Sequence, residues 1–352
     1  MNRIADKPIE RALVLAGGGG RGAYQVGVCQ FLEEKSWHPD MVLGNSIGAT
    51  NGAILVAPNS NQNLSGVELL QRVWRSEMTN KALHQASYEW PWCLRKTIDL
   101  VVKVLQALQK PCERAEADEL FRELVEKLAG VEWEKISLMD IILEMVGKPS
   151  LMERERWRQL LKQYVDFERL NASDAPYYCI AVTDVLTGAA QYFWNRVPPG
   201  AEDTEVGISV EHVMASSSIP GVYPATYVGE SEKREWWDGA CVANAPIGPA
   251  IDAGATDIIV VLMTPWHPQP KGDGVPLRSD DSSTVLDAFD RFIDWTMLAS
   301  LRSELKRTGL DQTVRIVAPK NIQSIVQIID YNLEETATLI QQGIDDAKDV
   351  LQ

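Results

Sequence analysis

A serine stands between two glycines in Gly44-Asn45-Ser46-Ile47-Gly48, which fits the pattern G-x-S-x-G. This pattern is typical of a nucleophile elbow, a sharp turn from a strand into a helix that exposes the serine hydroxyl. Because Gly44 and Gly48 have no Cβ, the strand and the helix can pass close on either side of the turn. The pattern predicts nucleophilic chemistry at Ser46, and the competing interpretation is an ordinary tight turn.

A run of glycines, Gly17-Gly18-Gly19-Gly20-Arg21-Gly22, forms a second candidate site. It lies between a predicted strand at 11–16 and a predicted helix at 23–35. Backbone N–H groups of such a loop, together with the partial positive charge of a helix N-terminus, bind negative charge. Two interpretations compete: a phosphate-binding loop of a nucleotide-binding protein, and an oxyanion hole for acyl transfer.

The oxyanion hole is the better interpretation of this glycine loop. A dinucleotide fingerprint needs an acidic residue ~20 residues further on, at the end of the second strand. Here the second predicted strand, at 41–43, leads into Ser46, and Asp40 precedes that strand. No Gly-Lys-Ser/Thr sequence follows the loop either. The next strand instead brings a serine to the same edge of the sheet.

A serine nucleophile needs a base, and two residues compete for that role. Asp238 ends a predicted strand and is followed by Gly239 and Ala240, small residues that let a ligand approach closely. Its other interpretation is an aspartate that stabilises a turn. His267 alone among the four histidines suits the order Ser, Asp, His of a hydrolase triad. Its other interpretation is an exposed residue of a Pro-rich loop.

Alternating strands and helices surround these residues and indicate an α/β fold. Further strands are predicted at 177–183, 190–194, 235–237, 257–263 and 314–318, and further helices at 47–56, 209–215, 245–253, 284–307 and 333–351.

Between about 60 and 172 the pattern changes, because glycine is sparse and helical periodicity dominates. Helices are predicted at 67–78, 94–108, 117–128, 138–146 and 152–170. We expect a single domain over 1–352 with a helical insertion or cap at about 60–172. The apolar helix at 94–108 carries Lys96 and Lys103. It is either a buried helix of the cap or a lipid-contacting surface.

The composition argues against several kinds of partner. Of the 352 residues, 45% are hydrophobic and 24% are charged, as in an ordinary globular protein. The net charge is −15, so the chain lacks the basic surface that binding to nucleic acid requires. The five cysteines are scattered, which argues against disulfides and zinc and favours buried free thiols. No metal or cofactor is expected.

The first ten residues hold no apolar signal segment, and no apolar run reaches ~20 residues. We expect a cytoplasmic protein whose membrane contact, if any, is peripheral.

Four motifs in this order together resemble the patatin-like phospholipase family: the glycine loop, the serine turn, Ala215–Pro220 and Asp238-Gly239-Ala240. The resemblance covers about 9–60 and 175–265. It implies a three-layer α/β/α sandwich with a Ser46–Asp238 dyad, no catalytic histidine and no metal. The oxyanion hole that it implies consists of Gly17, Gly18, Gly19, Gly20 and Arg21, and the supporting motif residues are Gly22, Gly44, Gly48, Gly239 and Ala240.

The family hydrolyses or transfers acyl chains of phospholipids, lysophospholipids or acylglycerols, so a lipid or another acyl ester is the expected substrate. The expected function is a serine acyl hydrolase that works through an acyl-enzyme. Two alternatives stay open. One is an acyltransferase with the same dyad, and the other is a nucleotide-binding protein without hydrolase activity.

Overall fold

The computed structural model describes residues 8–79, 85–86, 150, 152–199, 206–229, 234–266, 285–308, 314–320, 328 and 331–352. Contacts divide the chain into two units. The first comprises Met1–Leu83, Glu155–Ile219 and Ala225–Gln352, and the second His84–Arg154 and Pro220–Pro224. The helices predicted at 94–108, 117–128 and 138–146 lie outside the described residues, as does His267.

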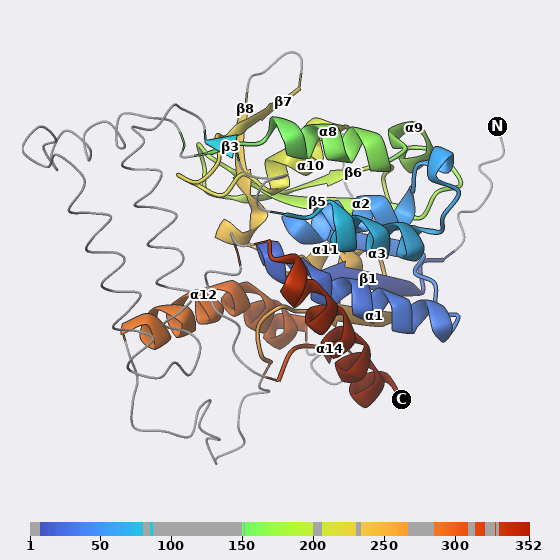
Figure 1. The fold of residues 1–352 in the computed structure, drawn as a ribbon. Helices are drawn as coiled ribbons and strands as arrows, with labels where there is room; N and C mark the ends of the chain where they lie inside the picture. Colours follow the sequence, from blue (N-terminus) through green and yellow to red (C-terminus); the bar gives the residue numbers. More distant parts are fainter. Residues whose placement is uncertain are drawn as a thin grey trace, which may run out of the picture. The chain divides into compact units, whose positions relative to one another are not determined.

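One mixed β-sheet runs through the first unit (Figure 1). Its strands are β1 (Arg11–Leu15), β2 (Met41–Gly44), β5 (Tyr177–Asp184), β6 (Ala190–Trp194), β7 (Thr226–Val228), β8 (Arg234–Asp238), β9 (Asp257–Val261) and β10 (Val314–Val317). Their order is β10-β9-β1-β2-β5-β8-β7, and β6 also pairs with β5. The strands from β10 to β5 are parallel, whereas the β5–β6, β5–β8 and β7–β8 pairs are antiparallel. The carboxyl ends of β1 and β2 therefore meet at one edge of the sheet.

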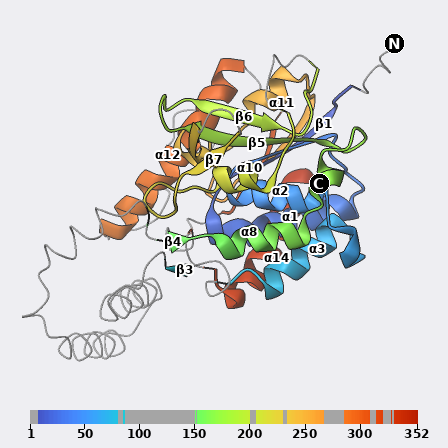
Figure 2. The ribbon, with the colours of Figure 1, turned by 90° about the horizontal axis from the view of Figure 1, so that it is seen from above.

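Helices cover both faces of this sheet (Figure 2). One face is packed by α1 (Ala23–Glu34), α2 (Ile47–Val56), α3 (Gly66–Ser76), α8 (Glu155–Tyr164), α10 (Val210–Ser216) and α14 (Leu333–Leu351). The other is packed by α11 (Gly248–Asp252) and α12 (Val285–Thr308). Each face has its own apolar cluster, so the layers are helix, sheet and helix. The expected three-layer α/β/α fold is confirmed.

The region expected as a helical insertion is only partly separate from the α/β unit. Helix α3 begins at a capping box, in which Ser65 and Glu68 satisfy each other's backbone, and it buries Trp74 in the main core. Helix α8 also belongs to the first unit. Both helices thus belong to the first unit, and a single domain with an insertion or cap at about 60–172 stays a prediction.

The single helix predicted at 152–170 is wrong. The chain forms β4 (Met152–Glu153), α8 and the short helix α9 (Phe167–Leu170). Val165 leaves the helix to form a bridge with Pro58, and the Asp166 side chain then accepts a hydrogen bond from the Arg169 N–H and caps α9.

Two further expectations concern membranes and thiols. Among the described helices, none is both long and apolar enough to cross a bilayer. Cys29 and Cys179 are buried free thiols as expected, whereas Cys241 is free and exposed.

Candidate active site

Ser46 occupies a strained turn between β2 and α2. Its backbone has φ 53° and ψ −121°, and α2 begins at the next residue. Such a conformation costs a residue with a Cβ on the order of 1–3 kcal/mol. A Cβ on Gly48 would lie 2.1 Å from the carbonyl oxygen of Leu15, so the helix can approach β1 only with glycine there. The predicted sharp strand-to-helix turn is confirmed.

Neighbouring segments hold this turn in place. The Ser46 N–H donates to Oγ of Ser216 at 2.8 Å, and the Asn45 N–H donates to the Leu15 carbonyl at 3.1 Å. Ser216 is the last residue of α10 and is completely buried. Its hydroxyl is 2.7 Å from the Ala181 carbonyl, to which it donates. Strand β5 and helix α10 thus fix the backbone that carries the serine.

Asp238 reaches the same edge of the sheet from β8. Along β5, Gly44 is opposite Ile180 and Asp238 is opposite Val182. Two residues of a strand span about 7 Å, and β5 separates β2 from β8 by two strand spacings of about 4.8 Å each, so the register places Asp238 at the same end of the sheet as the end of β2. The carboxylate is 2% exposed, and its Oδ1 accepts from Asn45 Nδ2 at 3.3 Å and from the Ala240 N–H at 2.8 Å.

Gly239, which follows Asp238, lets the chain pass close to Asn45, while the expected approach of a ligand stays a prediction. A Cβ on Gly239 would lie 2.3 Å from Asn45 Oδ1. Asp238 also stabilises a turn, which was its other interpretation, since its side chain caps the short helical turn Gly239–Cys241. Asp238 therefore lies beside Asn45 and caps a turn at the same time.

The glycine loop lies directly beside Ser46. A Cβ on Gly17 would be 3.2 Å from the Cβ of Ser46. The Gly17 N–H already donates to Asn244 Oδ1 at 3.1 Å, and the Arg21 N–H donates to the Gly18 carbonyl at 3.3 Å. Two of the five expected oxyanion donors are thus used within the protein. The N–H groups of Gly18, Gly19 and Gly20 have no acceptor among the described residues.

The Arg21 side chain is turned into the protein. It is 1% exposed, and its Nη1 lies 3.5 Å from Asp294 Oδ1 on α12 and 3.4 Å from the Met263 carbonyl oxygen. Gly22, which follows, has no space for a Cβ, since one would lie 2.6 Å from Ile47. Arg21 thus ties the loop to α12.

The model of the family described as patatin-like phospholipase matches residues 13–251. The chain belongs to the patatin-like phospholipase family. The matched segment contains the glycine loop, Ser46 and Asp238.

Relatives of this patatin-like chain include the neuropathy target esterase sws of Drosophila melanogaster and of Drosophila sechellia. Each is 38% identical over 79 residues, which is 22% of this chain and 5% of the relative. The match therefore spans a small fraction of the length of those proteins. Among solved structures, VipD from Legionella pneumophila aligns with a TM-score of 0.48 and 13% identity, over 98% of this chain and 67% of VipD. ExoU in its complex with SpcU from Pseudomonas aeruginosa aligns with a TM-score of 0.33 and 16% identity, over 98% of this chain and 52% of that chain.

Three residues of the patatin-like site were missed by sequence reasoning: Asn45, Ser216 and Asn244. All three are buried, and together they bridge the serine turn, Asp238 and the glycine loop. Ser216 lies in the motif at Ala215–Pro220, and Asn45 fills the unspecified second position of G-x-S-x-G. The only sequence signals were the asparagine next to the predicted nucleophile and the serines of the Ala215–Pro220 motif, and neither reveals these hydrogen bonds.

The described histidines, His38 and His212, contact other groups than Ser46. Nδ1 of His212 accepts from the Ser209 N–H at 3.0 Å and completes the cap of α10, while its ring packs edge-on against Phe193. Burial lowers the pKa of His212 to about 4, so it is neutral at pH 7.

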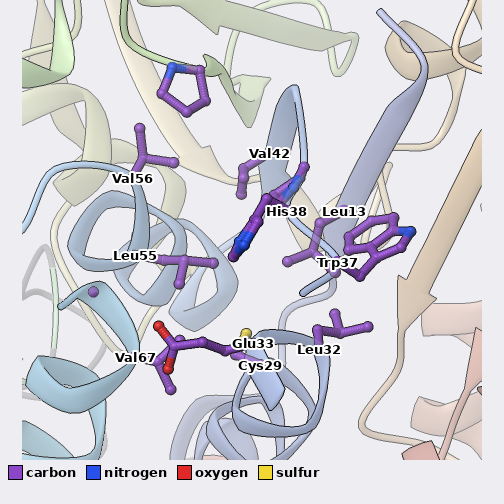
Figure 3. Close-up of a pocket in the computed structure, with 13 residues that line it drawn as sticks. Leu13, Cys29, Leu32, Glu33, Trp37, His38, Val42, Leu55, Val56 and Val67 are labelled. Carbon is purple, nitrogen blue, oxygen red and sulfur yellow. The ribbon is translucent and has the colours of Figure 1, made fainter. Parts of the chain in front are cut away.

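A separate cavity of about 200 Å³ lies at the opposite edge of the patatin-like sheet (Figure 3). His38 and Trp37, which precede β2, line it together with Leu55 at the end of α2. Ser46, by contrast, follows β2 and precedes α2. This cavity is therefore separate from the Ser46 site. Within the described residues, no cluster of three or more His, Cys, Asp or Glu is placed to hold a metal.

Proposed function

We propose that this chain is a serine acyl hydrolase that cleaves fatty acyl esters of phospholipids, lysophospholipids or acylglycerols. Ser46 is the nucleophile and Asp238 is the base. The observation that carries the proposal is the strained turn at Ser46, beside both the glycine loop and the Asn45–Asp238 hydrogen bond. Strained backbone persists where the surrounding structure enforces it, and it concentrates at functional sites.

In the first step Asp238 takes the proton of the Ser46 hydroxyl, and the serine oxygen attacks the ester carbonyl. The carbonyl oxygen becomes negative and is bound by N–H groups of the glycine loop, for which Gly18, Gly19 and Gly20 are the candidates, and donors held in place by the fold need no reorganisation. The bond to the leaving alcohol breaks, and that alcohol departs with the proton from Asp238. The acyl chain remains bound to Ser46 as an ester.

In the second step Asp238 removes a proton from water, and the resulting hydroxide attacks the acyl-enzyme. The same N–H groups stabilise the second oxyanion. The bond to Ser46 breaks, the serine oxygen recovers its proton from Asp238, and the fatty acid leaves. An acyltransferase would follow the same steps with an alcohol or a thiol in place of water.

The lipid class of the substrate is supported by family membership and by the 79-residue match to neuropathy target esterases. The family-model match over 13–251 includes both proposed catalytic residues. Contact with a membrane, where the lipid resides, is proposed to be peripheral.

Labelling with a fluorophosphonate tests the proposal, because the probe reacts with an activated serine. We expect one labelled site, Ser46, in the peptide map. A panel of phospholipids, lysophospholipids and acylglycerols, with and without an acceptor alcohol, then identifies products by mass spectrometry. Free fatty acid indicates a hydrolase, and a new ester indicates a transferase. No labelling at Ser46 would overturn the proposal and favour the nucleotide-binding alternative.

A further inference from the structure

The Asn45 side chain is hydrogen-bonded to Asp238 and to Asn244, and Asn244 in turn holds the glycine loop. Nδ2 of Asn45 donates to Asp238 Oδ1 at 3.3 Å and to Asn244 Oδ1 at 3.2 Å. Its Oδ1 lies 3.3 Å from Ser216 Oγ, whose proton goes to the nearer Ala181 carbonyl. An amide nitrogen has two N–H groups, so both donors are used. The side chain has no exposed surface.

These partners determine which way the amide points. Asn244 Oδ1 is an acceptor, because the Gly17 N–H donates to it at 3.1 Å. An ionised Asp238 only accepts. Nitrogen, not oxygen, must therefore face both groups. Aspartate and leucine have nearly the same shape as asparagine, but neither can donate these two bonds.

From this arrangement we propose that Asn45 is the positioning residue that keeps Asp238 ionised and locks it, with the glycine loop, to the serine turn. The inference rests on the proposed function of Ser46 and Asp238. A hydrogen bond donated to a carboxylate favours its charged form, which is the form that takes the serine proton. Through Asn244 and the Gly17 N–H, the same amide fixes the start of the oxyanion loop. One side chain thus couples the base and the oxyanion donors to the residue next to the nucleophile.

The test is the pH dependence of kcat/KM for a short soluble ester, measured for wild type, Asn45→Asp and Asn45→Leu. Without the donor, the pKa of Asp238 rises, so the acid limb of the profile moves to higher pH by about one unit or more. Asn45→Asp adds a negative charge beside Asp238 and gives the larger shift. We expect kcat to fall on the order of tenfold to a hundredfold, with a smaller change in KM, since Asn45 does not touch the substrate.

Asn195→Asp is the matched control. Asn195 is also a buried asparagine, with hydrogen bonds to the backbone of Tyr178 and Leu170 and none to the proposed site. Its replacement lowers the thermal midpoint but leaves the acid limb in place. If the Asn45 variants fold and their acid limbs stay at the wild-type pH, the inference is wrong. Should both fail to fold, Asn45→Ser, which is smaller and lacks the amide, must show the same shift.

Ser46→Ala in the same assay distinguishes a failure of the proposed function from a failure of the positioning role of Asn45. If Ser46→Ala stays active, the proposed function itself fails. If Ser46→Ala is inactive while the Asn45 variants keep the wild-type acid limb, the function stands and only the positioning role of Asn45 is rejected.

Discussion

At the scale of single residues, Ser46 is held in its strained turn by backbone contacts, not by its hydroxyl. The Ser46 N–H bond to Ser216 persists when the hydroxyl is removed. Ser46→Ala is therefore expected to fold normally and to lose esterase activity by several orders of magnitude, comparable to the ~10⁶ known for single triad replacements. Thermal unfolding and the rate on a short ester are the measurements. A folded variant with substantial activity would remove Ser46 from the mechanism.

A second residue-scale prediction separates a Ser–Asp dyad from a triad. Asp238→Asn keeps an oxygen for the Asn45 and Ala240 donors but cannot take the serine proton, so we expect a folded, inactive protein. In a triad the aspartate only orients a histidine, which moves the proton. His267→Ala, at a position outside the described residues, is expected to change the rate by no more than a few-fold. If His267→Ala is folded yet as inactive as Ser46→Ala, the dyad is replaced by a triad.

Short motifs were sufficient to predict the sharp turn at Ser46 and to draw attention to Asp238 and the glycine loop, because such motifs encode local geometry; the catalytic roles of these residues stay predictions. The sequence was insufficient for Asn45 and Asn244. Their hydrogen bond joins positions 199 apart in the chain, and only the folded sheet brings those positions together. The same holds for Gly17 and Arg21, whose N–H groups have partners that the motif does not reveal.

At the scale of elements, α10 carries a pH-sensitive cap beneath the serine turn. Burial lowers the pKa of His212 to about 4, below its usual value near 6.5. As pH falls from about 6.5 to about 4, the unfolded chain binds a proton that the native protein does not, so stability decreases. The loss approaches about 3 kcal/mol at the acid end, since one pKa unit corresponds to about 1.4 kcal/mol.

The measurement is the free energy of unfolding in urea between pH 7 and pH 4.5. His212→Gln retains an acceptor of the kind found in capping boxes but does not titrate. Its stability is expected to vary less with pH than that of the wild type. Equal slopes for both proteins would show that other groups cause the acid dependence.

Element boundaries were predictable in α14, whose 19 residues carry a clear apolar period, and in α2 and β5, which are buried along most or all of their length. Boundaries were not predictable where an element is very short or where a local cap ends one helix and begins another. Strand β7 has three residues, too few for an alternating pattern to be detected, and was missed. The helix predicted at 152–170 continued across Asp166 because its apolar period does not reveal that the side chain caps a new helix.

At the scale of the whole molecule, a net charge of −15 opposes attraction to an anionic bilayer. Binding to lipid then requires a local apolar surface with a few cations. The predicted helix at 94–108, outside the described residues, offers such a pattern, with Lys96 and Lys103 beside apolar positions. Replacing Val101, Val104 and Leu105 by serine is expected to weaken vesicle binding and hydrolysis of long-chain lipids.

Activity of the same triple variant on a small soluble ester provides the control. A lipid-contacting helix affects only substrates held in a bilayer or micelle, because the chemistry at Ser46 needs no surface binding. A buried cap helix, the competing interpretation, instead loses packing and destabilises the protein whatever the substrate. Selective loss on vesicles therefore supports a membrane role for residues 94–108, and equal loss on both substrates assigns the segment to the core.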